Sequence, residues 1–265
     1  MEVIILPDKA KAALLVARII ARALRAKPDL VLGLATGRTM EPVYGLLVEM
    51  HQQAGLDFSR CATFNLDEYI GIPADHPGSY RRYMDAFLFD RVNLSQARTH
   101  LPDGIASDLS AECHRYEALI AQAGGIDLQL LGIGDDGHIG FNEPLSSLRS
   151  RTREKALTPA TREQNAPQFG GDPAQVPGRA LTMGVGTILD SRRCLLLVTG
   201  RSKAAILAQA VEGPITAMVP ASALHLHPRC QVVADEEAAS ALRGIDQYRW
   251  LFAHEPEWAD FQDLA

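Results

Sequence analysis

Short apolar runs alternate with amphipathic helical stretches from one end of the chain to the other. The apolar residues 3–6, for example, precede a stretch, Lys9–Ala26, in which Ala, Leu and Ile recur at helical spacing. Alternation of this kind predicts an α/β fold, an open, mostly parallel, Rossmann-like sheet with helices on both faces. The other expected strands are residues 30–34, 61–66, 126–133, 194–198 and 231–234, and the other expected helices are residues 42–53, 109–122, 203–211 and 236–242.

The pattern continues without a linker or an internal repeat, so we expect a single domain over residues 1–265. The length of 265 residues and the 47% hydrophobic content suit one large core. A Pro- and Gly-rich stretch at residues 159–178 lies inside the pattern, and we interpret it as part of an active-site lid around residues 153–182.

Charge and cysteine content narrow the class of protein. The net charge of -6 and the absence of a dense Lys/Arg block predict no nucleic-acid partner and no membrane-surface binding. We find neither a basic leader nor a run of about 18 apolar residues, so we expect a cytoplasmic protein. The widely spaced cysteines should then be buried and reduced; they are Cys61, Cys113, Cys194 and Cys230.

The strongest chemical signal is the glycine-rich segment at residues 131–144, which directly follows an expected strand. Glycines allow tight turns and close approach to a ligand, while acids and an imidazole supply proton transfer. A loop that only joined two elements would not need both, so the segment predicts an active-site loop. Its polar residues are Asp135, Asp136, His138, Asn142 and Glu143.

Two other loops follow expected strands, and loops at the carboxyl ends of parallel strands converge on one crevice. Thr36, Gly37, Arg38 and Thr39 offer hydroxyls, backbone N–H groups and a guanidinium before a helix, which predicts an anion site, although a plain tight turn is the alternative. This loop lacks the Gly-Lys-Ser/Thr ending of a P-loop.

The third loop begins with Asp67 and Glu68. Neighbours in extended chain point to opposite sides, so only one of these carboxylates should face a ligand. A surface acidic pair fits the spacing equally well.

Two cofactor interpretations are weak. The segment from Gly132 to Gly137 matches the G-x-G-x-x-G dinucleotide pattern, but its aspartates would face a pyrophosphate and Pro144 precludes a long following helix. Asp135, Asp136 and His138 supply too few oxygen ligands for a typical hard-ion site. We therefore expect neither a bound dinucleotide nor a metal at this segment.

Together these loops resemble the glucosamine-6-phosphate deaminases, the glucosamine/galactosamine-6-phosphate isomerase family. The Asn-Leu-Asp-Glu-Tyr and Gly-His-Ile-Gly-Phe-Asn-Glu-Pro pieces are specific in combination, and the resemblance covers almost the whole chain. The matching segments are residues 32–37, 64–71, 131–144, 150–152, 180–187, 212–216 and 235–240.

The resemblance implies a cofactor-independent conversion of glucosamine 6-phosphate and water to fructose 6-phosphate and ammonia. It assigns sugar-ring opening to His138, with Asp136 and Glu143 orienting the imidazole, which is suited to proton exchange near neutrality. Asp67 would move a proton from C2 to C1, and we expect burial to raise its pKa. The phosphate is expected against residues 36–39, with Lys203 reaching in from a later helix.

The chain departs from the family pattern at the phosphate. Pro167 stands where the lid usually carries an arginine, and Arg38 stands where a small residue is usual. We hypothesise that Arg38 replaces the missing charge. Alternatively, the changes indicate another phosphosugar, such as galactosamine 6-phosphate.

Some family members are hexamers activated by N-acetylglucosamine 6-phosphate, whereas a monomer is the other assembly that the sequence allows. Ser146, Arg153 and Lys155 match the activator-binding pattern, but Ala156 stands where a threonine is usual. A solvated basic strand explains these residues equally well.

Two rival functions remain. A 6-phosphogluconolactonase would share the Gly-Asp-Gly-His core but not the Asp-Glu-Tyr and Phe-Asn-Glu-Pro pieces, so Asp67 and Glu143 argue against it. A non-catalytic sugar-phosphate sensor would need no base.

Overall fold

A parallel sheet forms the centre of the computed structural model, which describes residues 1–264. Within these residues the sheet has seven strands, and every neighbouring pair is parallel, which confirms the predicted fold class. In spatial order they are β1 (Glu2–Leu6), β10 (Cys230–Asp235), β9 (Cys194–Val198), β6 (Leu128–Leu131), β2 (Val31–Leu34), β3 (Ala62–Asn65) and β5 (Thr99–His100).

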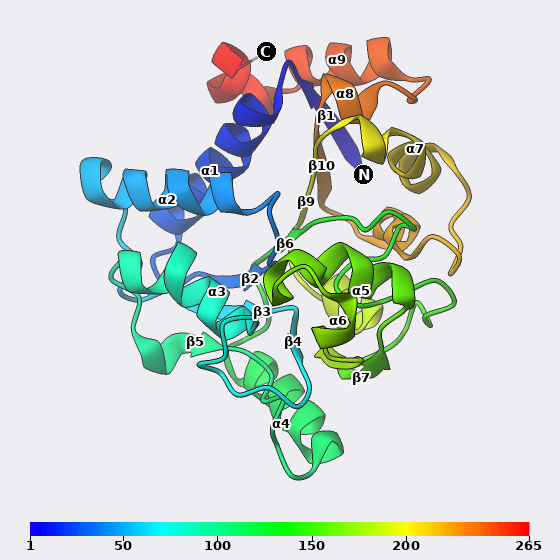
Figure 1. Cartoon of the computed structure of the whole chain (residues 1–265). Coiled ribbons are helices and arrows are strands. Elements are labelled where there is room, and N and C mark those ends of the chain that lie inside the picture. Colours follow the sequence, from blue (N-terminus) through cyan, green and yellow to red (C-terminus); the bar gives the residue numbers. More distant parts are fainter. Residues whose placement is uncertain (265) are drawn as a thin grey trace.

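Helices cover both faces of this sheet, with α1 and α2 on one side and α6 and α7 on the other (Figure 1). Helix α1 is capped by Asp8, whose carboxylate accepts a hydrogen bond from the Lys11 backbone N–H. Most of the Ala, Leu, Ile and Val side chains of this helix are buried. The helices are α1 (Lys9–Ala26), α2 (Glu41–Ala54), α3 (Tyr80–Phe87), α4 (Leu109–Gln122), α5 (Pro159–Asn165), α6 (Val185–Leu189), α7 (Ala204–Glu212), α8 (Glu236–Ala239) and α9 (Ile245–His254). Short 3₁₀ turns are η1 (Phe89–Arg91), η2 (Gln96–Arg98), η3 (Ala166–Phe169), η4 (Pro173–Gln175), η5 (Arg201–Lys203), η6 (Pro220–Leu226) and η7 (Pro256–Leu264).

The two halves of the sheet diverge between β2 and β6. From β2 the chain passes through α2, on one face of the sheet, to the neighbouring strand β3. From β6 it passes through α6, on the other face, to β9, which neighbours β6 on the side away from β2. Connections that leave neighbouring strands in opposite directions open a crevice at their carboxyl ends. This crevice holds the site described below.

A second, antiparallel sheet was not expected from the sequence. It consists of β4 (Asp67–Tyr69), β8 (Arg179–Thr182) and β7 (Arg153–Ala156), in that order. The segment between β7 and β8 contains α5, η3 and η4, and it packs on β4 through a small apolar cluster. The cluster is Tyr69, Tyr80, Phe141, Leu157, Ala166, Phe169, Val176 and Ala180.

The cysteines are all buried and free, as predicted. Within residues 1–264, none of the helices is long and apolar enough to cross a membrane. His225 and His227 lie in and just after η6, and each ring contacts a backbone carbonyl, of Val211 at 2.9 Å and of Ser191 at 2.7 Å respectively. These contacts tie each imidazole to the backbone of a segment elsewhere in the chain.

Candidate active site

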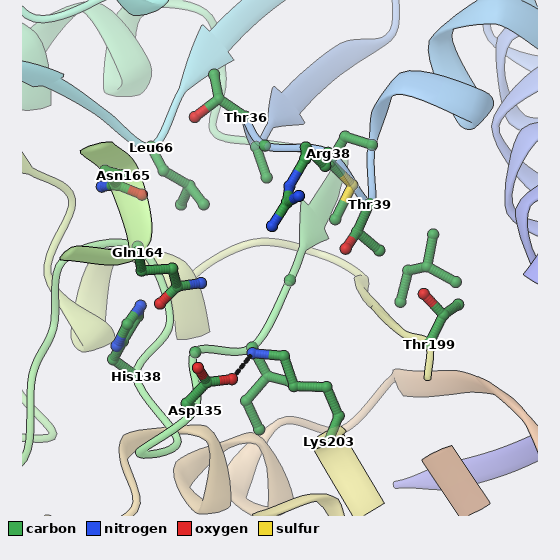
Figure 2. Close-up of a pocket in the computed structure, with 18 of the residues that line it drawn as sticks. Thr36, Arg38, Thr39, Leu66, Asp135, His138, Gln164, Asn165, Thr199 and Lys203 are labelled. Carbon is green, nitrogen blue, oxygen red and sulfur yellow. Dashed lines mark hydrogen bonds and ion pairs between the residues drawn. The ribbon is translucent and has the colours of Figure 1, made fainter. Parts of the chain in front are cut away.

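A cavity of about 530 Å³ opens where the parallel strands end. The loops after β2, β3, β6 and β9 all contribute to its wall, so the three loops expected to converge do so, and a fourth joins them (Figure 2). Among the residues singled out from the sequence, those lining the cavity are Thr36, Gly37, Arg38, Thr39, Asp67, Asp135, His138 and Lys203.

His138 faces the cavity, with two carboxylates beside its ring. Its Nδ1 lies 2.7 Å from Asp136 Oδ1 and 3.7 Å from Glu143 Oε2. A hydrogen bond from Nδ1 to Asp136 places the ring proton on that nitrogen and leaves Nε2 able to accept another. Asp136 and Glu143 do not line the cavity, so their path to a bound ligand would run through the imidazole.

Two glycines explain why this loop is glycine-rich. A Cβ on Gly134 would lie 2.1 Å from the His138 ring, so any other residue there would displace the imidazole. Gly140 has a φ of +57°, and a Cβ there would lie 3.2 Å from Asp67 Oδ2. The glycines thus let the loop place His138 and approach Asp67.

The carboxylates beside His138 have pKa values pushed in opposite directions. The hydrogen bond with His138 holds the pKa of Asp136 well below its usual range. Burial raises the pKa of Glu143, and the nearby Asp136 raises it further, while a hydrogen bond from Thr161 opposes the shift. The neighbours of the imidazole are therefore one firmly ionised acid and one acid that holds its proton more tightly.

Asp67 lies at the start of β4, opposite Thr182 of β8, and only 5% of it is exposed. Burial raises its pKa well above the ordinary value, and the neighbouring Glu68 adds to the effect. The predicted rise in this pKa is therefore confirmed in direction. A carboxylate of this kind is a stronger base when ionised than an exposed one.

Glu68 does not line the cavity, as the alternation of neighbouring side chains predicted. Its carboxylate accepts hydrogen bonds at 2.9 Å from the backbone N–H groups of Tyr69, Tyr80 and Arg81. Glu68 thus fastens the start of α3 to β4 and fixes the wall that contains Tyr80.

The cationic side chains that line the cavity are Arg38, Lys203 and Lys9, whose Nζ lies 3.9 Å from Glu237 Oε2. Arg38 is exposed, projects into the cavity, and makes no hydrogen bond or ion pair with residues 1–264 (Figure 2). Lys203 Nζ lies 2.5 Å from Asp135 Oδ1. Thr39 and Thr199 add hydroxyls beside these cations. This arrangement suits an anionic group.

Sequence reasoning missed the side chains that the segment between β7 and β8 contributes to the cavity, namely Thr161, Gln164, Asn165 and Gln168. The signal in the sequence that could have revealed them is the cluster of amide side chains on both sides of Pro167. Pro167 itself lies in η3 and does not line the cavity. Thr161 donates a 2.5 Å hydrogen bond to Glu143 Oε1.

The three residues matched to an activator site lie outside the cavity. The Arg153 guanidinium donates to Asn142 Oδ1 at 2.8 Å, so it braces the glycine-rich loop. The Ser146 hydroxyl is buried without a hydrogen-bond partner among the described residues. Lys155 lies two positions beyond Arg153 on β7.

A metal site at Asp135, Asp136 and His138 is not assembled, since Asp135 pairs with Lys203 instead. Donor atoms of Asp136, His138 and Glu143 do lie within 4.8 Å of one another. A proton on His138 Nδ1 accounts for the short contact with Asp136.

Comparison with known proteins identifies the family. The model of the glucosamine-6-phosphate isomerases/6-phosphogluconolactonase family matches residues 9–233. The chain belongs to this family. Members named glucosamine-6-phosphate deaminase include one from Streptomyces coelicolor, 48% identical, and one from an Arthrobacter species, 51% identical; each alignment spans 258 residues, 97% of this chain and 99% of the relative.

Solved structures place the chain within the same family. A monomeric glucosamine-6-phosphate deaminase superposes with a TM-score of 0.89 at 46% identity, covering 91% of this chain and 100% of the other. The 6-phosphogluconolactonase of Trypanosoma cruzi has a TM-score of 0.73 at 21% identity, covering 91% of this chain and 97% of the other. The second likeness concerns the fold alone.

Proposed function

We propose that this protein is a glucosamine-6-phosphate deaminase, which converts glucosamine 6-phosphate and water to fructose 6-phosphate and ammonia. The observation that carries the proposal is that Asp67, His138 and the cations Arg38 and Lys203 line one cavity. The relatives at 48% and 51% identity and the structural neighbour at 46% identity all bear this name.

The first step assigned to the site is opening of the sugar ring by His138. The imidazole removes the proton of the anomeric hydroxyl and delivers a proton to the ring oxygen as the C1–O5 bond breaks. Asp136 fixes the ring through the 2.7 Å hydrogen bond, and Glu143 supplies a second carboxylate 3.7 Å away. General acid–base catalysis by a group placed in this way contributes roughly 10²–10⁴-fold.

Asp67 then performs the isomerisation in this proposal. Its carboxylate takes the proton from C2 of the open-chain aldehyde and returns it to C1 through an enol-type intermediate, leaving an imine at C2. Water adds to C2, and the carbinolamine collapses to the ketone as ammonia departs. The raised pKa of Asp67, caused by burial, suits a group that must both accept and return a proton.

The phosphate is assigned to the cationic side of the cavity. Arg38 and the loop hydroxyls would bind its oxygens, and Lys203 would exchange Asp135 for the more highly charged phosphate. A guanidinium on the rigid loop would take the place of the charge that Pro167 does not supply.

The segment around residues 153–182 is proposed as a lid. Residues 153–156 and 179–182 are paired strands of the second sheet, so we assign lid movement to residues 157–178, which include Gln164 and Gln168 in the cavity wall. The paired strands would remain in place as the anchor of this movement.

For the assembly we propose a monomer, by analogy with the monomeric deaminase of 46% identity. Activation by N-acetylglucosamine 6-phosphate at Ser146, Arg153 and Lys155 stays a prediction. The engagement of Arg153 with Asn142 supports the alternative, a structural role. Light scattering tests the assembly, and reaction rates with and without N-acetylglucosamine 6-phosphate test the activation. A cytoplasmic location also stays a prediction.

The decisive experiment measures ammonia release from glucosamine 6-phosphate with and without EDTA. We expect EDTA-insensitive release, and release slowed by roughly 10²–10⁴-fold in an Asp67→Asn variant. Galactosamine 6-phosphate, assayed in parallel, tests the epimer, and 6-phosphogluconolactone tests the rival hydrolysis. Binding of the sugar phosphate without turnover would instead indicate a sensor.

A further inference from the structure

The two oxygens of Glu143 face different parts of the molecule. Oε2 lies 3.7 Å from His138 Nδ1 and has no hydrogen-bond partner among the described residues. Oε1 accepts a 2.5 Å hydrogen bond from the Thr161 hydroxyl and a weaker one, at 3.3 Å, from Thr158. The carboxylate therefore bridges the imidazole and a segment 15 to 18 residues further along the chain.

Both threonines belong to the start of helix α5. Thr158 is the N-cap, its hydroxyl oxygen accepts from the Thr161 backbone N–H at 3.2 Å, and the two hydroxyls lie 3.0 Å apart. Thr161 is 3% exposed, so no bulk water can replace its hydrogen bond to Glu143. The position of α5 thus determines whether Glu143 is held.

The same helix also reaches the ligand space. Gln164 and Asn165, on α5, both line the cavity (Figure 2). A ligand that contacts these amides would stabilise α5 in the position in which Thr161 reaches Glu143. Ligand contact and carboxylate orientation are therefore linked through one short helix.

We propose that Thr161 is a positioning residue that couples the seating of α5 over the substrate to the orientation of Glu143 beside His138. The inference rests on the proposed function and extends it. When α5 is in the position seen in this structure, Glu143 Oε1 is fixed by Thr161 and Oε2 is directed at the imidazole. With α5 displaced, Glu143 loses both hydroxyl donors, and the imidazole loses an oriented partner before ring opening can occur.

The hydrogen bond from Thr161 also opposes the rise that burial causes in the pKa of Glu143. Removing this donor should raise that pKa further, so a higher pH is needed to ionise Glu143. As a result, the acidic limb of the pH profile of kcat should move to higher pH. A purely structural role would change stability without moving this limb.

The test compares Thr161→Val, Thr161→Ser and Thr158→Val, because valine matches threonine in shape and serine restores the hydroxyl. For Thr161→Val we expect about a tenfold lower kcat at neutral pH, the scale of losing one hydrogen bond to a charged group. We also expect the acidic limb to move upward. Thr161→Ser should recover most of both, whereas Thr158→Val should also lower kcat, because it removes the N-cap of α5 together with the longer contact to Glu143.

Thr187→Val is the matched control. Thr187 is also 3% exposed and also donates to a carboxylate, Glu117 Oε1, at 2.6 Å, but neither residue lines the cavity. This variant should lose stability while keeping the wild-type pH profile of kcat. The same profile shift in Thr187→Val and Thr161→Val would overturn the inference, as would an unshifted profile in Thr161→Val.

A second readout does not depend on turnover. Titration of the Glu143 side-chain carboxyl by ¹³C NMR should give a higher pKa in Thr161→Val than in wild type, and serine should reverse the change. If wild-type protein releases no ammonia, the proposed function fails, while this titration still decides the contact. An unchanged Glu143 titration in Thr161→Val overturns the inference even in an active enzyme.

Discussion

Replacing Arg38 with alanine should weaken substrate binding, because among residues 1–264 it is the one Lys or Arg lining the cavity that has no ion-pair partner. Its partner cation, Lys203, lies 2.5 Å from the Asp135 carboxylate, so much of that charge is already compensated. Arg38 has no such partner within residues 1–264 and projects into the cavity (Figure 2). We therefore expect most of the uncompensated positive charge facing a phosphate to come from Arg38.

The magnitude follows from the exposure of the site. Two unit charges 4 Å apart at an effective dielectric constant of 20 interact by about 4 kcal/mol. Arg38 is exposed, so solvent and salt screen a large part of this energy. A residual of about 1.4 kcal/mol corresponds to a roughly tenfold rise in KM. We expect kcat to change much less, because Arg38 is assigned to the phosphate and not to the reacting carbons.

The assay is the KM for ammonia release at fixed ionic strength, repeated at higher salt. Arg38→Lys should fall between wild type and Arg38→Ala, since it keeps the charge but loses the planar fork. Arg201→Ala is the control, because Arg201 begins η5 near Lys203 but does not line the cavity. Raising the salt concentration should raise the wild-type KM more than the Arg38→Ala KM.

A double variant tests the idea that charge has been relocated from the lid to the loop. Pro167→Arg in the Arg38→Ala background should recover part of the lost affinity if a lid guanidinium can serve the same phosphate. A KM for Arg38→Ala within twofold of wild type, at low salt, would refute the reasoning.

Three further variants carry the remaining predictions. Asp67→Asn should reduce kcat by roughly 10²–10⁴-fold as the base is lost. Burial raises the folded-state pKa of Asp67 above its unfolded-state pKa, so the wild type loses stability as the pH rises from the unfolded-state pKa through the folded-state pKa. In thermal melts, the melting temperature of Asp67→Asn should therefore rise relative to that of the wild type between pH 4 and pH 8. A constant difference between the two melts would contradict this. Glu68→Gln should move the acidic limb of the pH profile of kcat/KM to lower pH, because it removes a negative neighbour that raises the pKa of Asp67. The melting temperature of this variant should fall, because the backbone N–H of Tyr80 loses a charged acceptor. An unmoved acidic limb would show that the two carboxylates are not coupled. Asp135→Asn should lower KM by releasing Lys203 to the phosphate, and a raised KM would indicate that Asp135 instead holds that lysine in place.

The sequence by itself determined six of the seven described strands of the central sheet, all but β5, and most of the site. Alternating apolar runs and helical periodicity are local signals, and parallel pairing brings the ends of distant strands to one edge. His138 and Asp67 could therefore be assigned to one crevice before their positions were known. Gly134 could be recognised as part of an active loop, although the reason for it, room for the His138 ring, became visible only in three dimensions.

The tertiary structure alone decided how these groups are held and tuned. Asp67 is buried because β4 pairs with β8, a contact between segments far apart in the chain that leaves no local periodicity in either. The pairing of Lys203 with Asp135 and the hydrogen bond from Thr161 to Glu143 likewise join separate segments. Residue types and spacing reveal which chemistry is available, whereas burial and long-range pairing set the pKa and orientation of each group, since both depend on what the rest of the chain packs around it.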